Sequence, residues 1–162
     1  MTYKGKYKVK NTEKYHGDHT NVVYICLWER QAFRWCDENA KIKSWSSEEI
    51  IIPYLYEVDK KYHRYFMDLK ITLDSGQTYL IEIKPEKELS PPTGSRKTKR
   101  YITEGLTFVK NQNKWKAASE YAKDRGWHFQ IWTEKELRSL GILPKAYDKL
   151  KPYTQPLSRK NK

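Results

Sequence analysis

The chain has 162 residues, a length typical of one domain with a substantial buried core. Its 32 Lys and Arg outnumber 20 Asp and Glu, and the formal net charge of +12 makes a polyanion, with nucleic acid first, the expected partner. The sequence has no apolar run long enough to span a bilayer and no basic amphipathic stretch with a clean apolar stripe, so we expect no membrane partner.

Residues 1–20 predict an irregular basic arm in which lysines alternate with tyrosines. Interleaved cations and aromatic rings suit a phosphate backbone and unstacked bases, but an arm lying on the domain with its lysines in water fits the pattern at least as well. The arm lacks the apolar segment of a secretory signal, so we expect a cytosolic protein. Cys26 and Cys36 have no metal-binding or redox spacing and are expected to be reduced and buried.

From Tyr24 to Asn39 the sequence predicts a helix, because apolar residues recur at helical spacing. Glu29 lies beside this apolar stripe and, taken alone, reads as an ordinary surface glutamate. The side chains expected on the buried face are Ile25, Trp28, Ala32, Trp35 and Cys36.

Residues 42–54 predict the first strand, with Pro53 ending its pairing. Glu48, in the same stretch, is by default the partner of a nearby arginine such as Arg64. A polar turn over residues 57–63 follows. The expected core residues of the strand are Ile50, Ile51 and Ile52.

Two runs of alternating apolar and polar residues, Tyr65–Leu73 and Gln77–Lys84, predict an antiparallel hairpin. A three-residue loop, Asp74-Ser75-Gly76, with the glycine at positive φ, keeps one face uniformly apolar. A slip of one residue would mix the two faces, so the pattern selects the register. The register pairs Met67 with Ile83, Leu69 with Ile81 and Ile71 with Tyr79.

The other face of this hairpin carries Asp68 directly opposite Glu82, with Lys84 two residues further on. Opposed carboxylates repel each other across a strand pair, and a hard cation such as Mg²⁺ or Mn²⁺ between them removes the conflict. A solvated face on an edge hairpin, with Lys84 neutralising Glu82, is an alternative of about equal weight at this point.

Residues 85–100 form a proline- and lysine-rich stretch in which Pro91-Pro92 and Gly94 forbid a regular element. A flexible basic loop leaving the second hairpin strand could close over DNA and become ordered by its phosphates. A plain solvated loop fits the same residues equally well.

The remaining elements follow from periodicity and from capping signals. Thr133 and Glu136 form the capping box of a short last helix. Residues 144–162 predict a basic tail, extended or flexible, after a domain formed by residues 1–143. Between the loop and the capping box we expect a helix from Thr103 to Asp124, which Gly126 ends, and a buried strand from Trp127 to Trp132.

Asp68, followed after the hairpin by Glu82-Ile83-Lys84, resembles the motif of the PD-(D/E)xK nuclease superfamily, with Met67 in place of its proline. The flanking segments resemble the head completion nucleases of T-even-type tailed phages, and the architecture is similar to the TnsA-type transposon endonucleases. The triplet alone is a weak signal, whereas the ordered set of segments from about Lys4 to Leu143 is a strong one. The matching segments are Trp28-Glu29, Glu48 with Ile52-Pro53-Tyr54, 64–68, 81–85, 114–118 and Thr133-Glu134.

The resemblance implies an α/β, restriction-endonuclease-like fold whose mixed sheet is flanked by helices. It also implies metal-dependent hydrolysis of DNA with Mg²⁺ or Mn²⁺ as cofactor. Asp68, Glu82 and the main-chain carbonyl of Ile83 would hold the metal. Glu29 would complete its shell, and Lys84 would orient water or offset charge. The further site residues are Glu48 as a supporting acid and, for DNA, Arg64, Arg96, Lys97, Lys99, Arg100 and Lys114.

The resemblance further implies that the protein processes packaged phage DNA before the head joins its tail. The expected location is the host cytoplasm or the virion, with head or portal proteins as partners beside DNA. Two alternatives stay open: a non-catalytic DNA-end-binding or capsid-assembly factor, and a junction-resolving or transposon-type endonuclease. Monomer and homodimer are both compatible with the sequence.

Overall fold

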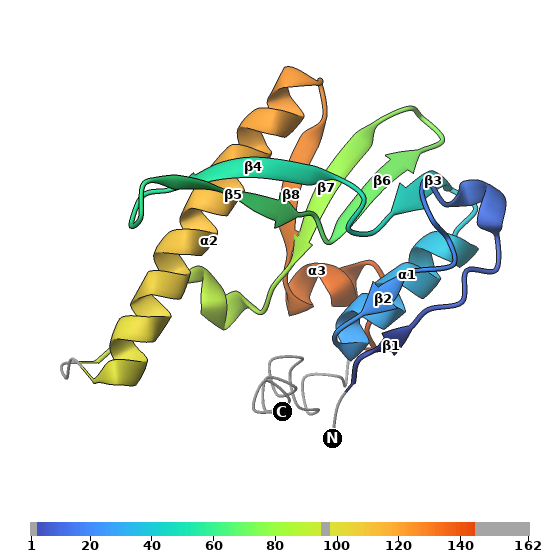
Figure 1. Ribbon diagram of the computed structural model, residues 1–162. Helices are drawn as coiled ribbons and strands as arrows, with labels where there is room; N and C mark the ends of the chain where they lie inside the picture. The colour runs from blue at the N-terminus through green and yellow to red at the C-terminus, as the bar shows by residue number, and fades with distance from the viewer. Residues whose placement is uncertain (1–2, 95–97, 145–162) are drawn as a thin grey trace.

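The computed structural model describes residues 3–94 and 98–144, and its centre is a four-stranded mixed sheet (Figure 1). The first three strands of the sheet pair antiparallel, and the last one runs parallel to its neighbour. Helices flank this sheet, which confirms the predicted α/β class. The strands, in spatial order, are β3 (Ile42–Ser46), β6 (Leu69–Leu73), β7 (Thr78–Ile83) and β8 (His128–Trp132).

The β6–β7 hairpin has the register that the alternating pattern predicts. Leu69 pairs with Ile81 and Ile71 with Tyr79. The main-chain N–H of Gly76 donates to the carbonyl of Leu73, and Gly76 has a φ of +92°. A side chain at that φ is strained, so the glycine fits the three-residue loop.

The first half of the predicted hairpin is not one continuous strand. The chain bends at Met67, whose main-chain N–H donates to the carbonyl of Ile50 and whose carbonyl accepts from the N–H of Glu48. Met67 consequently packs in the same buried cluster as Leu80 and not beside Leu69. The predicted pairing of Met67 with Ile83 on one uniform face is therefore wrong. The tertiary hydrogen bonds of Met67 turn its side chain to the other face of the sheet.

The predicted strand over residues 42–54 is also two strands, since β3 ends at Ser46 and β4 (Ile51–Tyr56) begins after Glu48, which has a φ of +57°. β4 and β5 (Lys61–Phe66) form a separate antiparallel ribbon. Pro53 does not end the pairing but lies opposite Arg64, as an edge strand tolerates. Ile51 is 42% exposed although a core position was expected, because neighbouring residues of a strand point to opposite sides.

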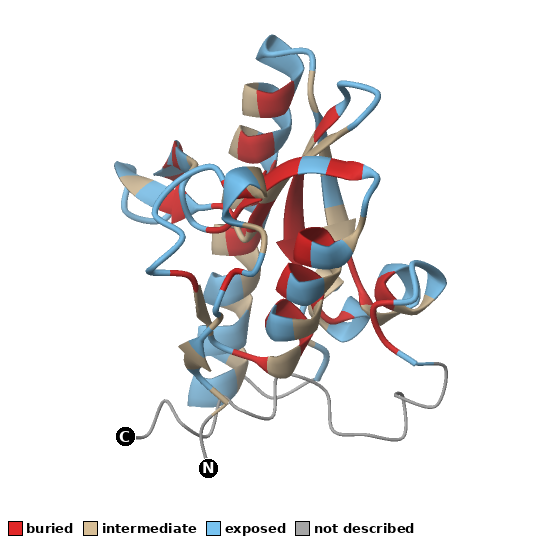
Figure 2. Cartoon of the chain, turned by 90° about the vertical axis from the view of Figure 1, so that its right-hand side faces the viewer, coloured by how far each residue is buried: buried red, intermediate tan, exposed pale blue. Residues whose placement is uncertain are grey.

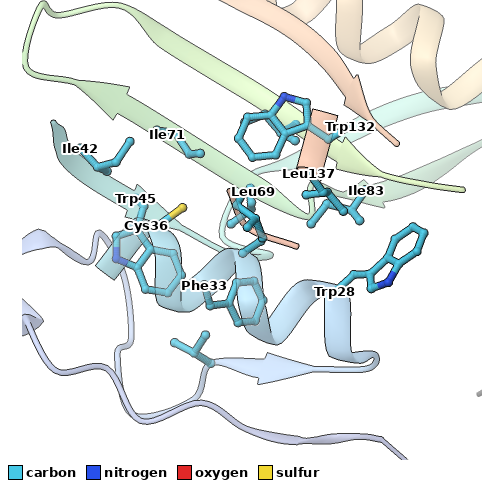
Figure 3. Close-up of a cluster of buried hydrophobic side chains, with 14 of the residues drawn as sticks. Trp28, Phe33, Cys36, Ile42, Trp45, Leu69, Ile71, Ile83, Trp132 and Leu137 are labelled. Carbon is cyan, nitrogen blue, oxygen red and sulfur yellow. The ribbon is translucent and has the colours of Figure 1, made fainter. Parts of the chain in front are cut away.

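One face of the sheet is covered by α1 (Leu27–Glu38) and α3 (Glu134–Ser139), the other by α2 (Lys99–Asp124) and the β4–β5 ribbon (Figure 1). Figure 3 shows side chains of α1, such as Phe33, pointing toward the sheet residues Leu69 and Ile71. On the other face Leu80 is fully buried in the cluster that contains Trp115. The hairpin is covered on both faces, so the solvated-face alternative is wrong.

The helices carry buried and exposed residues on different sides (Figure 2). α1 begins at Leu27, not at Tyr24, because Tyr24 belongs to β2 (Val23–Tyr24), which pairs with β1 (Gly5–Lys6). Ile25 precedes the helix and is exposed, contrary to expectation. Trp28, Ala32 and Cys36 are buried as predicted, together with Cys26, which like Cys36 is a free thiol.

α2 ends at Asp124 as predicted, and Gly126 follows with a φ of +72°. It begins four residues early, since Thr98 caps it and places Lys99 in its first turn. β8 is an edge strand with only Trp132 buried, not a buried strand. The Thr133 capping box is confirmed. Short 3-10 turns, η1 (Thr12–Lys14) and η2 (Glu86–Leu89), complete the described chain.

Residues 145–162, nearly all of the expected tail, lie outside the described residues. Within the described ranges, none of the helices combines the length and the apolar character needed to cross a membrane.

Candidate functional site

Two carboxylates meet where β5 passes into β6 and where β7 ends. Asp68 lies in the bend between β5 and β6, and its Oδ2 accepts a hydrogen bond of 2.8 Å from the main-chain N–H of Ile83. Glu82 lies in β7 and is 6% exposed, and its Oε1 accepts a hydrogen bond of 2.5 Å from the hydroxyl of Tyr65. One main-chain N–H and one buried tyrosine hydroxyl thus hold the acid pair.

The electrostatics of the pair favour a bound cation. Burial raises the pKa of Asp68 well above its ordinary value, and the nearby carboxylates of Glu82 and Glu29 raise it further. The N–H of Ile83 and the charge of Lys84 oppose this shift without cancelling it. Desolvated like charges cost free energy that a divalent cation among them recovers.

Glu29 is not the surface glutamate that its neighbours in the sequence suggest. It lies in the first turn of α1, is 6% exposed, and accepts a hydrogen bond of 2.9 Å from the main-chain N–H of Ile25. A carboxylate in the first turn is favoured by the helix dipole. Its neighbour Trp28 lies at the same end of the apolar cluster as Ile83 (Figure 3), which brings the start of α1 to the end of β7.

Lys84 brings a positive charge to the acid pair. Its Nζ lies 3.4 Å from Oε2 of Glu82. Burial lowers the pKa of Lys84, but the charges of Glu82 and Asp68 outweigh burial, and the net shift is upward. Lys84 is therefore a permanently charged donor beside the carboxylates at neutral pH.

Lys114 approaches the same region from α2. Its Nζ lies 5.3 Å from the ring centre of Tyr65 and 6.0 Å from that of Tyr54, both within the range of cation–π attraction. Burial lowers the pKa of Lys114, while the charges of Glu82 and Asp68 act in the opposite direction. The fold thus brings together Glu29, Asp68, Glu82, Lys84 and Lys114 from separate parts of the sequence.

The donor set fits a hard divalent cation in chemistry. Asp68 and Glu82 supply carboxylate oxygens, and the main-chain carbonyl of Ile83 is the third donor expected from the sequence. Among residues 3–94 and 98–144, however, no group of three or more His, Cys, Asp or Glu side chains stands ready to hold a metal ion.

The contacts of the other residues expected at the site lie outside this cluster. Glu48 has a left-handed φ and is exposed as a whole residue, while partial desolvation of its carboxyl group raises its pKa. Arg64 is exposed on β5, with its guanidinium carbon 5.4 Å from the ring centre of Phe66. An Arg64–Glu48 ion pair is not among the contacts of the described residues.

The expected basic loop is shorter than the sequence indicates. Lys99 and Arg100 are exposed in the first turn of α2, where Arg100 pairs with Glu104 at 3.5 Å, so their assignment to the loop is wrong. The helix includes them because Thr98 supplies its cap. Arg96 and Lys97 lie outside the described residues.

Tyr65 is the site residue that the sequence does not reveal. Strand alternation assigns it to the same side as Leu69, on the apolar face. The bend at Met67 instead turns β5 into the ribbon and brings the Tyr65 hydroxyl to Glu82. No local pattern in the sequence signals this contact, because it joins residues 17 positions apart across two sheets.

The chain is similar in sequence to known nucleases. Residues 39–134 match the family model described as TnsA-like endonuclease N terminal, a range that includes Asp68, Glu82 and Lys84 but not Glu29. The chain is 43% identical over 147 residues to the head completion nuclease of Enterobacteria phage T4. That similarity covers 88% of this chain and 98% of the relative.

Proposed function

This chain belongs to the TnsA-like endonucleases, and we propose that it is a metal-dependent DNA endonuclease that acts in phage head completion. The endonuclease activity rests on the family match and on the similarity to the T4 head completion nuclease. The head-completion setting rests on that relative alone. The host cytoplasm and the virion are the locations that this setting implies, with head or portal proteins as further partners.

The metal dependence is supported by one observation above all. Asp68 is half-buried beside Glu82 and Glu29, and desolvation together with the charges of these two carboxylates raises its pKa more than the N–H of Ile83 and the charge of Lys84 lower it. We propose that Asp68, Glu82 and the carbonyl of Ile83 hold Mg²⁺ or Mn²⁺, with Glu29 in or beside the shell. When bound, such a cation activates a water molecule and stabilises charge on the scissile phosphate.

The protein's own cations would act on the DNA substrate. Lys84, held charged by Glu82 and Asp68, is suited to donate a hydrogen bond to a phosphate oxygen or to orient the attacking water. Lys114 adds a second positive charge from the opposite wall. Both side chains offset negative charge that develops on the phosphate in the transition state.

A non-catalytic DNA-end-binding factor is the competing function, and the acid pair speaks against it. A protein that only binds a polyanion gains nothing from carboxylates buried beside its cations, since they repel phosphates. A transposon-type or junction-resolving endonuclease remains a second candidate because the matching family model is named after TnsA. A preference for branched over linear DNA would distinguish it.

A plasmid-cleavage assay tests the proposal. We expect cutting with Mg²⁺ or Mn²⁺ and none with EDTA, and a loss of about 100-fold or more in Asp68→Ala, Glu82→Ala and Lys84→Ala, because each removes a ligand or a charge at the reacting phosphate. Glu86→Ala is the matched control, since this exposed glutamate pairs with Lys135 away from the acid pair. DNA binding measured in EDTA should survive in all variants.

Two outcomes contradict parts of this proposal. Full activity of Asp68→Ala or Glu82→Ala would overturn the assignment of the acid pair. A wild-type protein that binds DNA yet cuts no substrate with either metal would favour the non-catalytic binding factor.

A further inference from the structure

Tyr65 connects the β4–β5 ribbon to the acid pair. It is 3% exposed, lies near the end of β5, and donates its hydroxyl hydrogen to Oε1 of Glu82 at 2.5 Å. Hydrogen bonds to ionised carboxylates are short and about twice as strong as those between neutral groups. This bond therefore restrains the side chain of Glu82 from the opposite layer of the fold.

The ring of Tyr65 is itself held in place. The Nζ of Lys114 lies over its face at 5.3 Å from the ring centre. Tyr54 meets it edge to face, with ring centres 6.5 Å apart and an interplanar angle of 86°. The position of the hydroxyl is thus set by packing before any ligand arrives, as pre-organised sites require.

The two oxygens of Glu82 are divided between two donors. Oε1 accepts from Tyr65, whereas Oε2 lies 3.4 Å from Nζ of Lys84. Without the tyrosine hydroxyl, Glu82 is free to turn fully toward Lys84 and to form a closer ion pair with it. That pairing would compete with a metal ion for the same carboxylate.

We propose that Tyr65 is a positioning residue, whose hydroxyl holds Oε1 of Glu82, keeps the carboxylate from closing onto Lys84 and so leaves Oε2 open to a divalent cation. This inference rests on the proposed metal-dependent function, and it adds a residue outside the D…ExK motif. Groups that hydrogen-bond a metal ligand orient it, and their loss costs metal affinity even though they never touch the metal.

Tyr54 provides a matched control. It is also 3% exposed, belongs to the same buried cluster, and has the same Lys114 ammonium over its ring, at 6.0 Å. Within the described residues its hydroxyl makes no hydrogen bond to a carboxylate. Removal of that hydroxyl changes packing in the same way as in Tyr65 but leaves Glu82 untouched.

The test is isothermal titration of Mn²⁺ into the metal-free full-length protein without DNA. We expect Tyr65→Phe to bind Mn²⁺ about tenfold more weakly than the wild type, and Tyr54→Phe to bind it with unchanged affinity. Circular dichroism and the melting temperature verify that both variants are folded. A purely structural role of Tyr65 would lower the melting temperature and leave the affinity of the folded protein unchanged.

A second variant examines the same link from the other partner. Glu82→Asp keeps the charge but shortens the side chain by one methylene group, which draws the carboxylate away from Tyr65. We expect it to weaken Mn²⁺ binding, and Tyr65→Phe to add no further loss in that background, as coupled residues do.

The outcomes separate this inference from the proposed function. Equal Mn²⁺ affinity of wild type and folded Tyr65→Phe, or additive losses in the double variant, would overturn the positioning role and leave the nuclease assignment intact. A wild-type protein that binds no Mn²⁺ at all would overturn both.

Discussion

Asp37, a buried carboxylate outside the candidate site, fastens the amino-terminal arm to α1. It is fully buried in the last turn of the helix, where the helix dipole disfavours negative charge. Its oxygens accept hydrogen bonds from the hydroxyl of Tyr7 at 2.8 Å and from the main-chain N–H groups of Lys10 at 2.8 Å and Asn11 at 3.0 Å. These bonds offset both the dipole and the desolvation of the charge.

The pH dependence of stability follows from these bonds. Burial by itself raises the pKa of Asp37, but the hydrogen bonds from Lys10, Asn11 and Tyr7 outweigh burial and lower it. A carboxyl group with a lower pKa in the folded state stabilises the fold above its unfolded pKa. This contribution is lost as the pH falls below about 4 toward the folded pKa.

We predict that Asp37→Asn lowers the free energy of unfolding at pH 7 by about 2–3 kcal/mol. The change removes a charged acceptor and places the NH2 group of an amide, itself a donor, against N–H donors. The difference from wild type should shrink near pH 3, where the carboxyl group of the unfolded wild-type chain is mostly protonated and ionisation of Asp37 stabilises the fold less. Urea unfolding at both pH values measures it, with the exposed Asp124→Asn as control. Equal stability at pH 7 would contradict the prediction.

At the scale of elements, two threonine caps allow a comparison of a packed and an unpacked helix end. Thr133 forms a capping box with Glu136 at the start of α3, which carries the fully buried Leu137 into the core. Thr98 caps α2 by accepting from the N–H of Tyr101 at 3.1 Å, but the turn it begins is exposed, with Ile102 52% exposed.

We predict that Thr133→Ala lowers the free energy of unfolding by about 1–2 kcal/mol, whereas Thr98→Ala changes it by less than about 0.5 kcal/mol. The reason is that the first turn of α2 can fray without opening the core, while the start of α3 cannot. Chemical denaturation of both variants measures the difference. Equal losses in the two would show that the start of α2 unfolds together with the core.

The β4–β5 ribbon is the element that most changes the expected site. Its inner side brings Tyr54 and Tyr65 onto the sheet, and its end leads through the bend at Met67 into Asp68. The sequence suggests two continuous strands here, over residues 42–54 and 65–73, and the structure divides each of them between the ribbon and the sheet. Period-2 alternation carries no information on which sheet a strand joins.

At the scale of the whole molecule, the net charge of +12 predicts DNA binding that depends strongly on salt. Each phosphate neutralised by a cation releases counterions, so the logarithm of the binding constant falls linearly with that of the salt concentration. On α2, Lys114 makes cation–π contacts with the rings of Tyr54 and Tyr65, beside the candidate site. Lys116, two residues on, is exposed and points to another side of the helix.

We predict that Lys114→Met weakens binding to DNA of any sequence and reduces the magnitude of the salt slope by about one, as the loss of one phosphate contact should. Lys116→Met should change neither quantity. Fluorescence anisotropy with a duplex oligonucleotide in EDTA, over a range of KCl concentrations, measures both. An unchanged slope for Lys114→Met would remove this lysine from the DNA interface.

Several features could be predicted from the sequence because each depends on residues close together in the chain. The alternation of apolar and polar residues fixed the pairing of Leu69 with Ile81, since a slip would have exposed the core face. Gly76 marked the loop by its freedom at positive φ, and Thr133 marked the last helix by its capping box. The spacing of Asp68, Glu82 and Lys84 by itself indicates the acid site.

The tertiary structure alone decided what lies around that acid site. The switch of Met67 to the other cluster, the burial of Glu29 and the hydrogen bond from Tyr65 to Glu82 all join segments far apart in sequence. Local periodicity reports only which side of a strand or helix a residue occupies. Which layer covers that side, and hence which carboxylates lose water and which hydroxyl restrains them, depends on how the layers pack.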